Sequence, residues 1–214
     1  MAKIAVVDKF CNTEYKFSGS LVQHLKTIGH EVISTDAFTD SLFSCDSIHF
    51  DWADEVTCAG INSIIKNESS PRITVRVHAY ELHDGLASRI PWEKVDALIF
   101  VSKHYQNIFN SLKIRAPKSQ HVIQHGIDSS RFGRVNHTGN NILFVGSINF
   151  KKGPQLLAQV ALEFPDREVH VFGDIQCHRS KVYFNHLKIP NLKFFPRRKH
   201  IEKVMQDPQY GYNP

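Results

Sequence analysis

Short runs of apolar residues alternate along the chain with stretches in which apolar residues recur every three or four positions. The apolar runs predict β-strands at residues 4–7, 32–33, 48–50, 73–77, 97–101 and 122–123. Helical spacing occupies residues 21–28, 61–65 and 105–112, and Gly29 is a typical stop for the first helix. Strands separated by helices in this way are typical of a parallel sheet covered on both faces. The pattern predicts an α/β doubly wound domain, whose ligands bind beyond the carboxyl ends of the strands.

A second series of elements follows a polar stretch at residues 129–141, which has neither a helical nor a strand period. This series predicts strands at residues 142–145, 169–172 and 192–195, and helices at residues 154–164, near 182–187 and from about 200. We therefore predict an N-terminal domain over residues 1–135 and a second, Rossmann-like domain over residues 141–214. Because doubly wound domains have about five or six strands, the second domain is expected to be incomplete.

Composition and charge narrow the class of protein. Apolar residues make up 42% of the 214 residues and charged residues 22%, as in ordinary soluble globular proteins. No apolar run approaches the roughly 18 residues of a membrane span, so we expect a cytoplasmic protein, with peripheral attachment to the inner face of a membrane left open. The net charge of +5 comes from the C-terminal part of the chain. Residues 1–140 hold 15 basic and 15 acidic residues, and residues 141–214 hold 11 basic and 6 acidic residues. This excess suits an anionic ligand, but a solvated basic face explains it equally well.

Candidate chemistry follows three of the predicted strands of the N-terminal domain. The turn Ser18-Gly19-Ser20 opens a helix and offers backbone N–H groups to an anion, although a serine there also serves as an N-cap. His78 and Glu81 follow the fourth strand. His78 can donate to a hydroxyl or phosphate, Glu81 can orient it or bind a sugar hydroxyl, and a structural histidine is the competing interpretation.

Carboxylates and an aromatic residue follow the third strand. Asp51 and Asp54 flank Trp52, which suggests either carboxylate chemistry or a loop that shapes an acceptor pocket. The histidines and the four cysteines show no metal-ligand spacing, so no metal site is predicted.

The most specific stretch lies in the second domain. A strand ends at Gly146, Ser147 follows, and Lys151-Lys152-Gly153 opens a helix. Lysine charge and the positive end of the helix dipole converge there, which suits a diphosphate; a solvated lysine pair at a helix start is the alternative. Neither the P-loop spacing nor the GxGxxG spacing of dinucleotide folds is present.

Taken in order, these motifs resemble the retaining glycosyltransferases of the GT-B fold, the large family 4 that includes sucrose synthases and bacterial lipopolysaccharide and capsule sugar transferases. The matching segments are Lys3 to Asp8 with Ser18-Gly19-Ser20 and Gly29-His30-Glu31-Val32, Arg76-Val77-His78-Ala79-Tyr80-Glu81, Asp96 to Ser102, Gln124-His125-Gly126-Ile127-Asp128 and Phe132, and Phe144-Val145-Gly146 with Lys152-Gly153. The last two resemble the family's interdomain element and its donor loop.

The resemblance implies a function and a role for each candidate residue. A hexose would pass from a nucleotide-diphosphate sugar to a glycan or lipid-linked acceptor, with retention of configuration, in carbohydrate biosynthesis. Neither a cofactor nor a metal would be required. The implied catalytic residues are His78 and Glu81. The implied acceptor-binding residues are Ser18, Asp51 and Trp52. The implied donor-binding residues are Gly19, Gly146, Ser147, Lys151, Lys152 and Gly153.

Two departures from the family pattern keep other interpretations open. Ser147 stands where the donor loop usually has an arginine, which removes a bidentate phosphate contact. The family's paired glutamates, seven residues apart, have no counterpart in this sequence, so a C-terminally truncated enzyme is expected. One alternative is a non-catalytic remnant that binds a glycan or a partner. Another is an unrelated α/β protein that binds a nucleotide or nucleic acid, suggested by Arg197-Arg198-Lys199-His200; nucleic acid is not the expected partner, because no aromatic residues interleave with this cluster.

Overall fold

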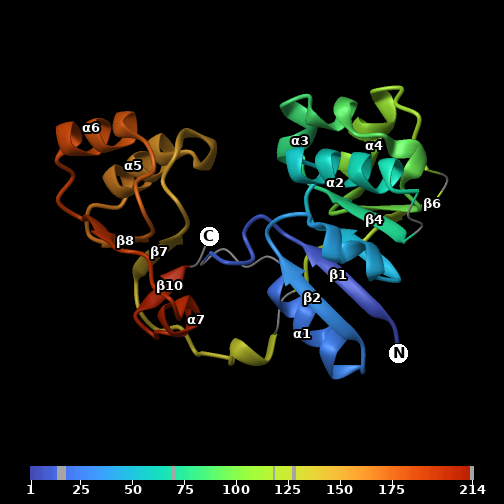
Figure 1. The fold of residues 1–214 in the computed structure, drawn as a ribbon. Coiled ribbons are helices and arrows are strands. Elements are labelled where there is room, and N and C mark those ends of the chain that lie inside the picture. Colours follow the sequence, from blue (N-terminus) through green and yellow to red (C-terminus); the bar gives the residue numbers. More distant parts are fainter. Residues whose placement is uncertain (14–17, 69–70, 118, 127–128, 213–214) are drawn as a thin grey trace. The chain divides into compact units, whose positions relative to one another are not determined.

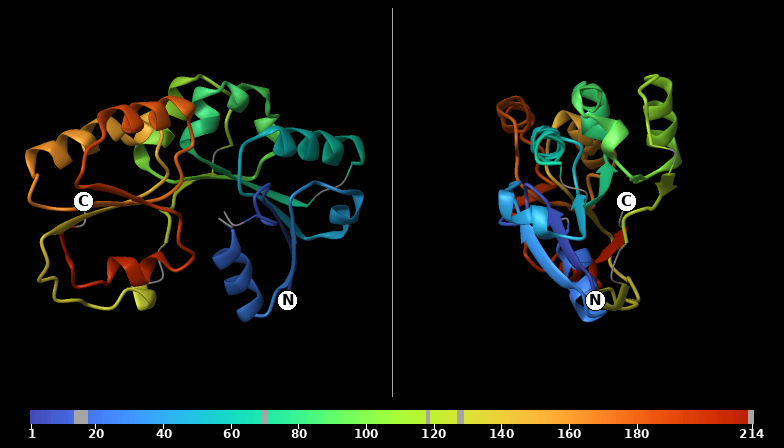
Figure 2. Two further views of the ribbon diagram at one scale, coloured as in Figure 1. Left: turned by 90° about the vertical axis from the view of Figure 1, so that its left-hand side faces the viewer. Right: turned by 45° about the vertical axis from the view of Figure 1, so that its right-hand side comes forward.

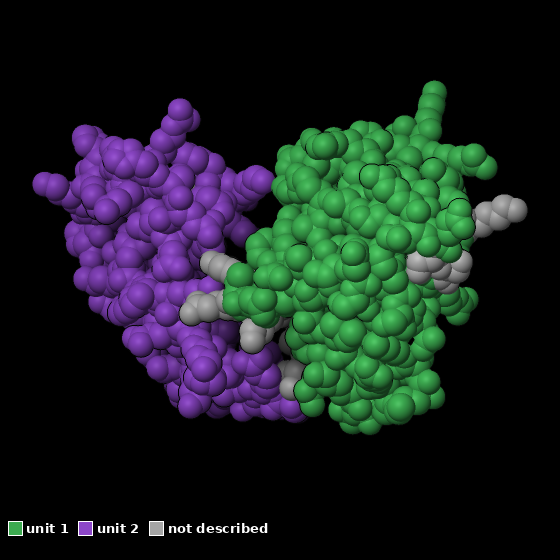
Figure 3. Space-filling view, viewed as in Figure 1, with its two compact units in different colours: residues 1–126 green, residues 127–214 purple. Residues whose placement is uncertain are grey.

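A computed structural model of the chain describes residues 1–13, 18–68, 71–117, 119–126 and 129–212, without the side chains of residues 154 and 212. The chain divides into two compact units, Met1–Gly126 and Ile127–Pro214, which Figure 3 shows in different colours. Each unit is built around its own parallel sheet. None of the described helices is long and apolar enough to span a membrane.

The first unit contains a six-stranded, all-parallel sheet in the order β2-β1-β3-β4-β5-β6. The strands are β1 Lys3–Val7, β2 Glu31–Thr35, β3 Ser47–Phe50, β4 Arg72–Val77, β5 Ala97–Phe100 and β6 Ser119–Val122. The helices are α1 Gly19–Thr27, α2 Glu55–Lys66, α3 Ala79–His83 and α4 Lys103–Ser111, and the 3-10 turns are η1 Asp40–Ser44, η2 Leu86–Arg89 and η3 Trp92–Lys94. This architecture confirms the doubly wound α/β prediction.

Alternation along the strands places the core on one face of this sheet. Phe50, Val75 and Phe100 are fully buried and pack with Ile61 of α2 and Phe109 of α4. Helices α2, α3 and α4 lie over this face, whereas α1 lies against the other (Figures 1 and 2). The second face is more polar, since the alternate positions of β3 and β4 hold charged and hydroxyl side chains. The sequence therefore builds one apolar layer and leaves the opposite face to polar contacts.

Helix starts in this unit are fixed by side chains at the carboxyl ends of strands. Asp54 follows β3 and accepts hydrogen bonds from the backbone N–H groups of Val56 and Thr57 at the start of α2. Ser102 follows β5 and accepts from the N–H of Tyr105 at the start of α4. These caps satisfy donors that the first turn of a helix leaves without partners.

The strand predicted at residues 122–123 lies earlier in the chain than expected. Strand β6 covers Ser119–Val122 and ends where the apolar pair begins. It is an edge strand with partly or fully exposed side chains, so its residues need not be apolar and its periodicity is weak.

The second unit contains a parallel sheet in the order β10-β7-β8-β9. Its elements are η4 Ser129–Arg131, β7 Asn141–Val145, η5 Phe150–Lys152, α5 Pro154–Glu163, β8 Val169–Phe172, α6 His178–Leu187, β9 Leu192–Phe195, α7 Ile201–Met205 and β10 Tyr210–Tyr212. Helices α5 and α6 lie on one face of the sheet and α7 on the other (Figures 1 and 2). The sequence predicted three strands here, and it missed β10 because a three-residue strand with a central glycine carries no apolar run.

The polar stretch that separates the two predicted series belongs to the second unit. Arg131 donates to Glu202 of α7 at 2.9 Å, and Gln206 donates to the carbonyl of Arg131 at 3.0 Å. The N–H groups of Thr138 and Gly139 donate to the carbonyl of Pro208. These contacts attach the stretch to α7 and to the turn before β10.

Candidate functional site

A buried carboxylate at the end of β1 organises the carboxyl edge of the first sheet. Asp8 is fully buried. Its Oδ2 accepts from the N–H and hydroxyl of Ser18, at 3.1 and 2.6 Å, and its Oδ1 accepts from the N–H of Phe10 and the indole N–H of Trp52, at 2.9 and 3.1 Å. Four donors therefore converge on one side chain. Ser18 holds the N-cap position of α1, but its hydroxyl bonds to Asp8 and does not cap the helix.

The loop after β3 and the histidine after β4 form a stack of rings. The imidazole of His78 lies 4.1 Å from the Trp52 ring, nearly parallel to it, and 5.3 Å from the ring of His125. Nε2 of His78 donates to the carbonyl oxygen of Asp51 at 2.9 Å. Burial lowers the pKa of His78 to about 4, against the weaker opposing effects of the hydrogen bond and charge of Asp51. His78 is therefore neutral at pH 7.

Glu81 positions the backbone around this histidine. Its side chain is fully buried, with Oε1 accepting from the N–H of Ala53 and Oε2 from the N–H of His78. The carboxylate thus joins the loop after β3 to the start of α3, where it forms a capping box with His78. Burial raises the pKa of Glu81, and the backbone N–H groups oppose that shift.

A second polar network surrounds the side chain of Asp51, which follows β3. Its Oδ1 accepts from Arg76 at 2.7 Å and contacts His49 at 3.3 Å, and His49 contacts Thr74 at 2.8 Å. Asp51 is fully buried. Because its backbone carbonyl also accepts from His78, this network fixes the position of the ring stack through the end of β3.

The exposed part of the first-unit site is a lysine among aromatic rings. Nζ of Lys9 lies 5.3, 5.4 and 5.0 Å from the ring centroids of Phe10, Trp52 and Tyr80. It also pairs with Asp54 at 3.1 Å. Burial alone lowers the pKa of Lys9, but the hydrogen bond and charge of Asp54 outweigh it, so the pKa is raised and the ammonium stays charged. Tyr80 is 38% exposed, so this cluster, unlike Ser18, Asp51 and Glu81, offers a surface to a ligand.

A glycine allows the loops after β7 and β8 of the second unit to approach each other closely. Gly173 has a φ of 153°, and a Cβ built on it would lie 2.1 Å from the carbonyl oxygen of Gly146. The contact continues as a parallel bridge between Ile148 and Ile175 and a hydrogen bond from Asn149 to Gln176 at 3.0 Å. The loop after β7 is therefore held firmly against its neighbour.

Five of the six predicted donor residues lie along this loop. Lys151 and Lys152 belong to η5, and Gly153, with a φ of 64°, is the N-cap of α5. Both lysine side chains are exposed and form no ion pair with any described residue. The N–H of Ser147 likewise has no acceptor within the described parts of the chain. Two cations and an unused N–H thus accompany a helix N-terminus, an arrangement that suits an anion.

The structure brings five predicted residues into one network: Ser18, Asp51, Trp52, His78 and Glu81. The six predicted donor residues fall in both units, with Gly19 as the first residue of α1 and the other five between β7 and α5. Of the interdomain element, residues 127–128 lie outside the described residues. The sequence assigned no role to Asp8, Lys9 or Tyr80. A charged pair directly after the first strand was the signal available for Asp8 and Lys9.

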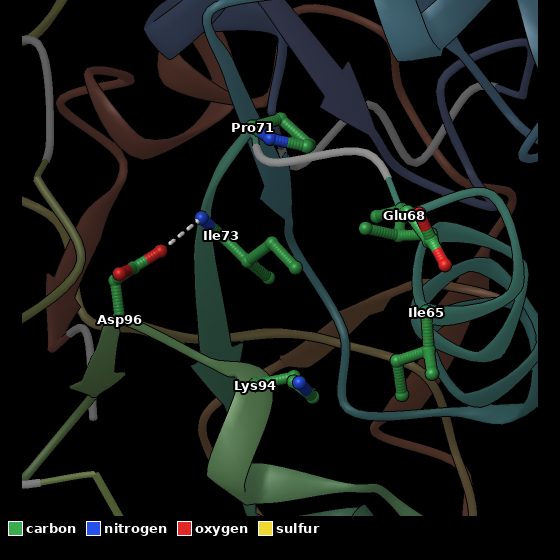
Figure 4. A pocket seen from close by; sticks show the side chains of 7 residues that line it. Ile65, Glu68, Pro71, Ile73, Lys94 and Asp96 are labelled. Atoms are coloured by element: carbon green, nitrogen blue, oxygen red, sulfur yellow. Dashed lines mark hydrogen bonds between the residues drawn. The ribbon is translucent and has the colours of Figure 1, made fainter.

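A cavity of about 450 Å³ lies where the strands of the first sheet begin, opposite their carboxyl ends. Its lining includes Ile65, Glu68, Lys94 and Asp96, and Oδ2 of Asp96 accepts from the N–H of Ile73 at 2.7 Å (Figure 4). It is thus at the amino ends of β4 and β5, away from the network of Asp8 and His78. Among the described residues no group of three or more His, Cys, Asp or Glu side chains could hold a metal ion.

No protein-family model and no curated protein matches the sequence. Solved structures do match the fold. One is Alr3699/HepE from Anabaena, determined in complex with UDP and glucose; it has 15% identity and a TM-score of 0.60, with 100% of this chain and 73% of that chain covered. Another is AviGT4, a glycosyltransferase involved in avilamycin A biosynthesis, with 12% identity and a TM-score of 0.62 over 96% of this chain and 67% of that chain. With its two parallel α/β units, the chain has the fold of these GT-B glycosyltransferases.

Proposed function

We propose that the chain is a glycosyltransferase that moves a hexose from a nucleotide-diphosphate sugar to a glycan or lipid-linked acceptor, with retention of configuration. The observation that carries the proposal is the loop between β7 and α5, where two exposed lysines, which have no ion-pair partner among the described residues, precede a helix N-terminus within a GT-B fold. Departure of the sugar leaves negative charge on the diphosphate, and fixed cations and N–H groups stabilise that charge. The complex of HepE with UDP and glucose supports a nucleotide-linked donor.

Lys151 and Lys152 would carry most of the diphosphate interaction. Ser147 has no positive charge, so the neighbouring N–H groups and lysines take the place of a bidentate arginine contact. Gly153 allows the backbone to turn into α5, and Gly173, which has no Cβ, allows the loop after β8 to approach the carbonyl of Gly146. The donor site proposed here needs no metal, so we expect transfer to persist in the presence of EDTA.

We place the acceptor on the cluster of Lys9, Trp52 and Tyr80. The carbon-bound hydrogens of a sugar ring pack favourably on aromatic faces, and the charged lysine can donate to its hydroxyls. Ser18 and Asp51 would support this surface from behind, through Asp8 and the His78 stack. His78, neutral at pH 7, would contact the transferred sugar through its ring and not shuttle a proton, because its Nε2 already donates to the carbonyl of Asp51, and Glu81 would hold its backbone.

Calorimetry with UDP tests the donor site directly. Lys152→Ala should weaken UDP binding by roughly 1–3 kcal/mol, the range for a hydrogen bond to a charged group. Lys66→Ala, an exposed lysine at the end of α2 in the first unit, is the matched control and should leave the affinity unchanged. Equal UDP affinity for the Lys152→Ala variant and the unaltered chain would remove this lysine from the donor site.

A transfer assay separates the enzyme from its alternatives. The chain is incubated with UDP-glucose and a panel of sugar acceptors, and product is followed by mass spectrometry. Product formation supports the proposal. UDP binding without product on any acceptor would favour a non-catalytic remnant, and tight, strongly salt-dependent binding to random DNA without UDP binding would favour a nucleic-acid protein.

A further inference from the structure

Strand β9 is an edge of the sheet in the second unit. Its only strand partner among the described residues is β8. The carbonyl oxygens of Asn191 and Phe195 accept from the N–H groups of Val169 and Gly173, on the side of β8. Successive residues of a strand direct their backbone groups to opposite sides. The N–H and C=O of Phe194 therefore point outward from the free edge, on the side opposite β8. An extended peptide could pair with these groups.

Cavities flank this edge on both faces of the sheet. One, of about 410 Å³, lies on the side of α6 and is lined by Phe184, Ile189, Leu192 and Phe194. The other, of about 460 Å³, lies on the side of α7 and is lined by Phe172, Phe195, Val204 and Tyr210. Both linings are mainly apolar. Side chains of a strand added beside β9 would point alternately toward one cavity and the other.

The cavities also carry basic side chains. Lys181 and Lys188 line the cavity beside α6, and Arg198 and Lys203 line the cavity beside α7. The one acid in these linings, Asp207, accepts from both the backbone and the side chain of Gln209. Basic side chains therefore outnumber acidic ones around β9: Lys193 is exposed on the strand itself, and Glu168, which interacts with Lys193, is the second acid.

We infer that β9 binds a partner segment in the extended conformation, a short apolar core flanked by acidic residues, which adds a strand to the sheet of the second unit. Backbone hydrogen bonds to Phe194 would give affinity, the two cavities would select apolar side chains, and the lysines would select the flanking acids. Pairing with β9 of a second copy is disfavoured, because it would bring the two sets of lysines together. The linings of the two cavities contain none of the residues of the proposed donor and acceptor sites.

The probe is a fluorescent synthetic peptide in which alternating valines and phenylalanines are flanked at both ends by glutamates. We expect saturable binding to the full chain by fluorescence anisotropy, and protection of the Phe194 amide from hydrogen exchange when the peptide is bound. Two versions of the peptide, or phases, are N-methylated at alternate amides, one at the odd positions and the other at the even positions. The phase whose methyl groups face β9 should not bind, and the phase whose methyl groups face away from β9 should still bind. This comparison requires no change to the protein, so misfolding cannot explain it.

A charge-reversal variant tests the selection of acids. Lys181→Glu combined with Lys188→Glu should weaken binding of the probe by about tenfold or more. Lys66→Glu, in the first unit, is the matched control. The proposal is overturned if the probe does not bind, if both N-methylation phases bind equally, if a peptide with lysines in place of the glutamates binds as well, or if the chain dimerises through β9 without a peptide.

Discussion

Asp8 illustrates how one side chain can hold three loops together. Its carboxylate accepts from Phe10, from Ser18 and from the indole of Trp52, so it joins the end of β1 to the start of α1 and to the loop after β3. A buried acceptor with this many donors stabilises the folded state mainly because the donors have no alternative partner once they are buried.

Replacing Asp8 with Asn should destabilise the first unit. The amide retains one acceptor oxygen, but its NH₂ group would face donors, so at least one buried donor loses its partner, at a cost of about 1–3 kcal/mol. Urea denaturation of the first unit would measure the loss. Asp84→Asn, an exposed residue after α3, is the control and should be neutral. Equal stability of the two variants would contradict the role given to Asp8.

His78 gives the first unit a pH dependence. Its pKa is about 4 in the folded chain, lowered by burial, against 6.5 for the free side chain. Between these values the unfolded chain binds a proton that the folded chain does not. The stabilisation is therefore fully present above pH 6.5 and is lost as the pH falls toward 4, by on the order of 2–3 kcal/mol. Denaturation at pH 7 and pH 4.5 should show a smaller loss for His78→Gln than for the unaltered chain; parallel losses would refute the assignment.

At the scale of elements, the two loops at the carboxyl edge of the second sheet depend on each other. Gly146 and Gly173 have nearly the same φ, 156° and 153°, but only Gly173 has backbone within 3 Å of a Cβ position. The loop after β7 can carry the lysines in a fixed position because the loop after β8 supports it from behind.

This difference predicts unequal effects of the same substitution. Gly146→Ala should cost about 1–3 kcal/mol through its left-handed backbone alone. Gly173→Ala adds a clash with the carbonyl of Gly146, so the loops must separate, and both the stability of the second unit and UDP binding should decrease further. Thermal denaturation and calorimetry would compare the two variants. Similar losses for both would show that the close approach does not matter.

At the scale of the whole molecule, each unit has its own hydrophobic core. The core of the first unit includes Trp92, Phe100 and Phe109, and the second unit has one cluster on each face of its sheet. Because the cores are separate, the units are expected to unfold in separable transitions.

A ligand should then act on one transition. UDP bound to the loop before α5 should raise the unfolding temperature of the second unit in proportion to the logarithm of the UDP concentration. The unfolding temperature of the first unit should stay unchanged. Differential scanning calorimetry of the unaltered chain and Lys152→Ala would measure both transitions. A rise confined to the transition of the first unit would place the nucleotide in that unit and contradict the proposed donor site.

The sequence by itself determined the parallel α/β architecture, because buried strands need continuous apolar runs and the helices between them need a regular apolar face. It also predicted a donor site in the loop of Lys151 and Lys152, since chemistry in this fold follows the ends of strands. It misplaced the exposed edge strand β6 and missed the short β10, where burial does not impose a pattern.

Only the tertiary structure decided which polar residues are enclosed and which are exposed. Ser18, Asp51 and Glu81 stand at strand and helix ends like ligand-binding residues, yet their side chains bond to other parts of the chain. Lys9 and Tyr80 have ordinary surface identities, yet they gather around Trp52. Side-chain partners come from β1, β3 and β4, which are far apart along the chain, and hydrogen bonds between them leave no periodic signal in the sequence.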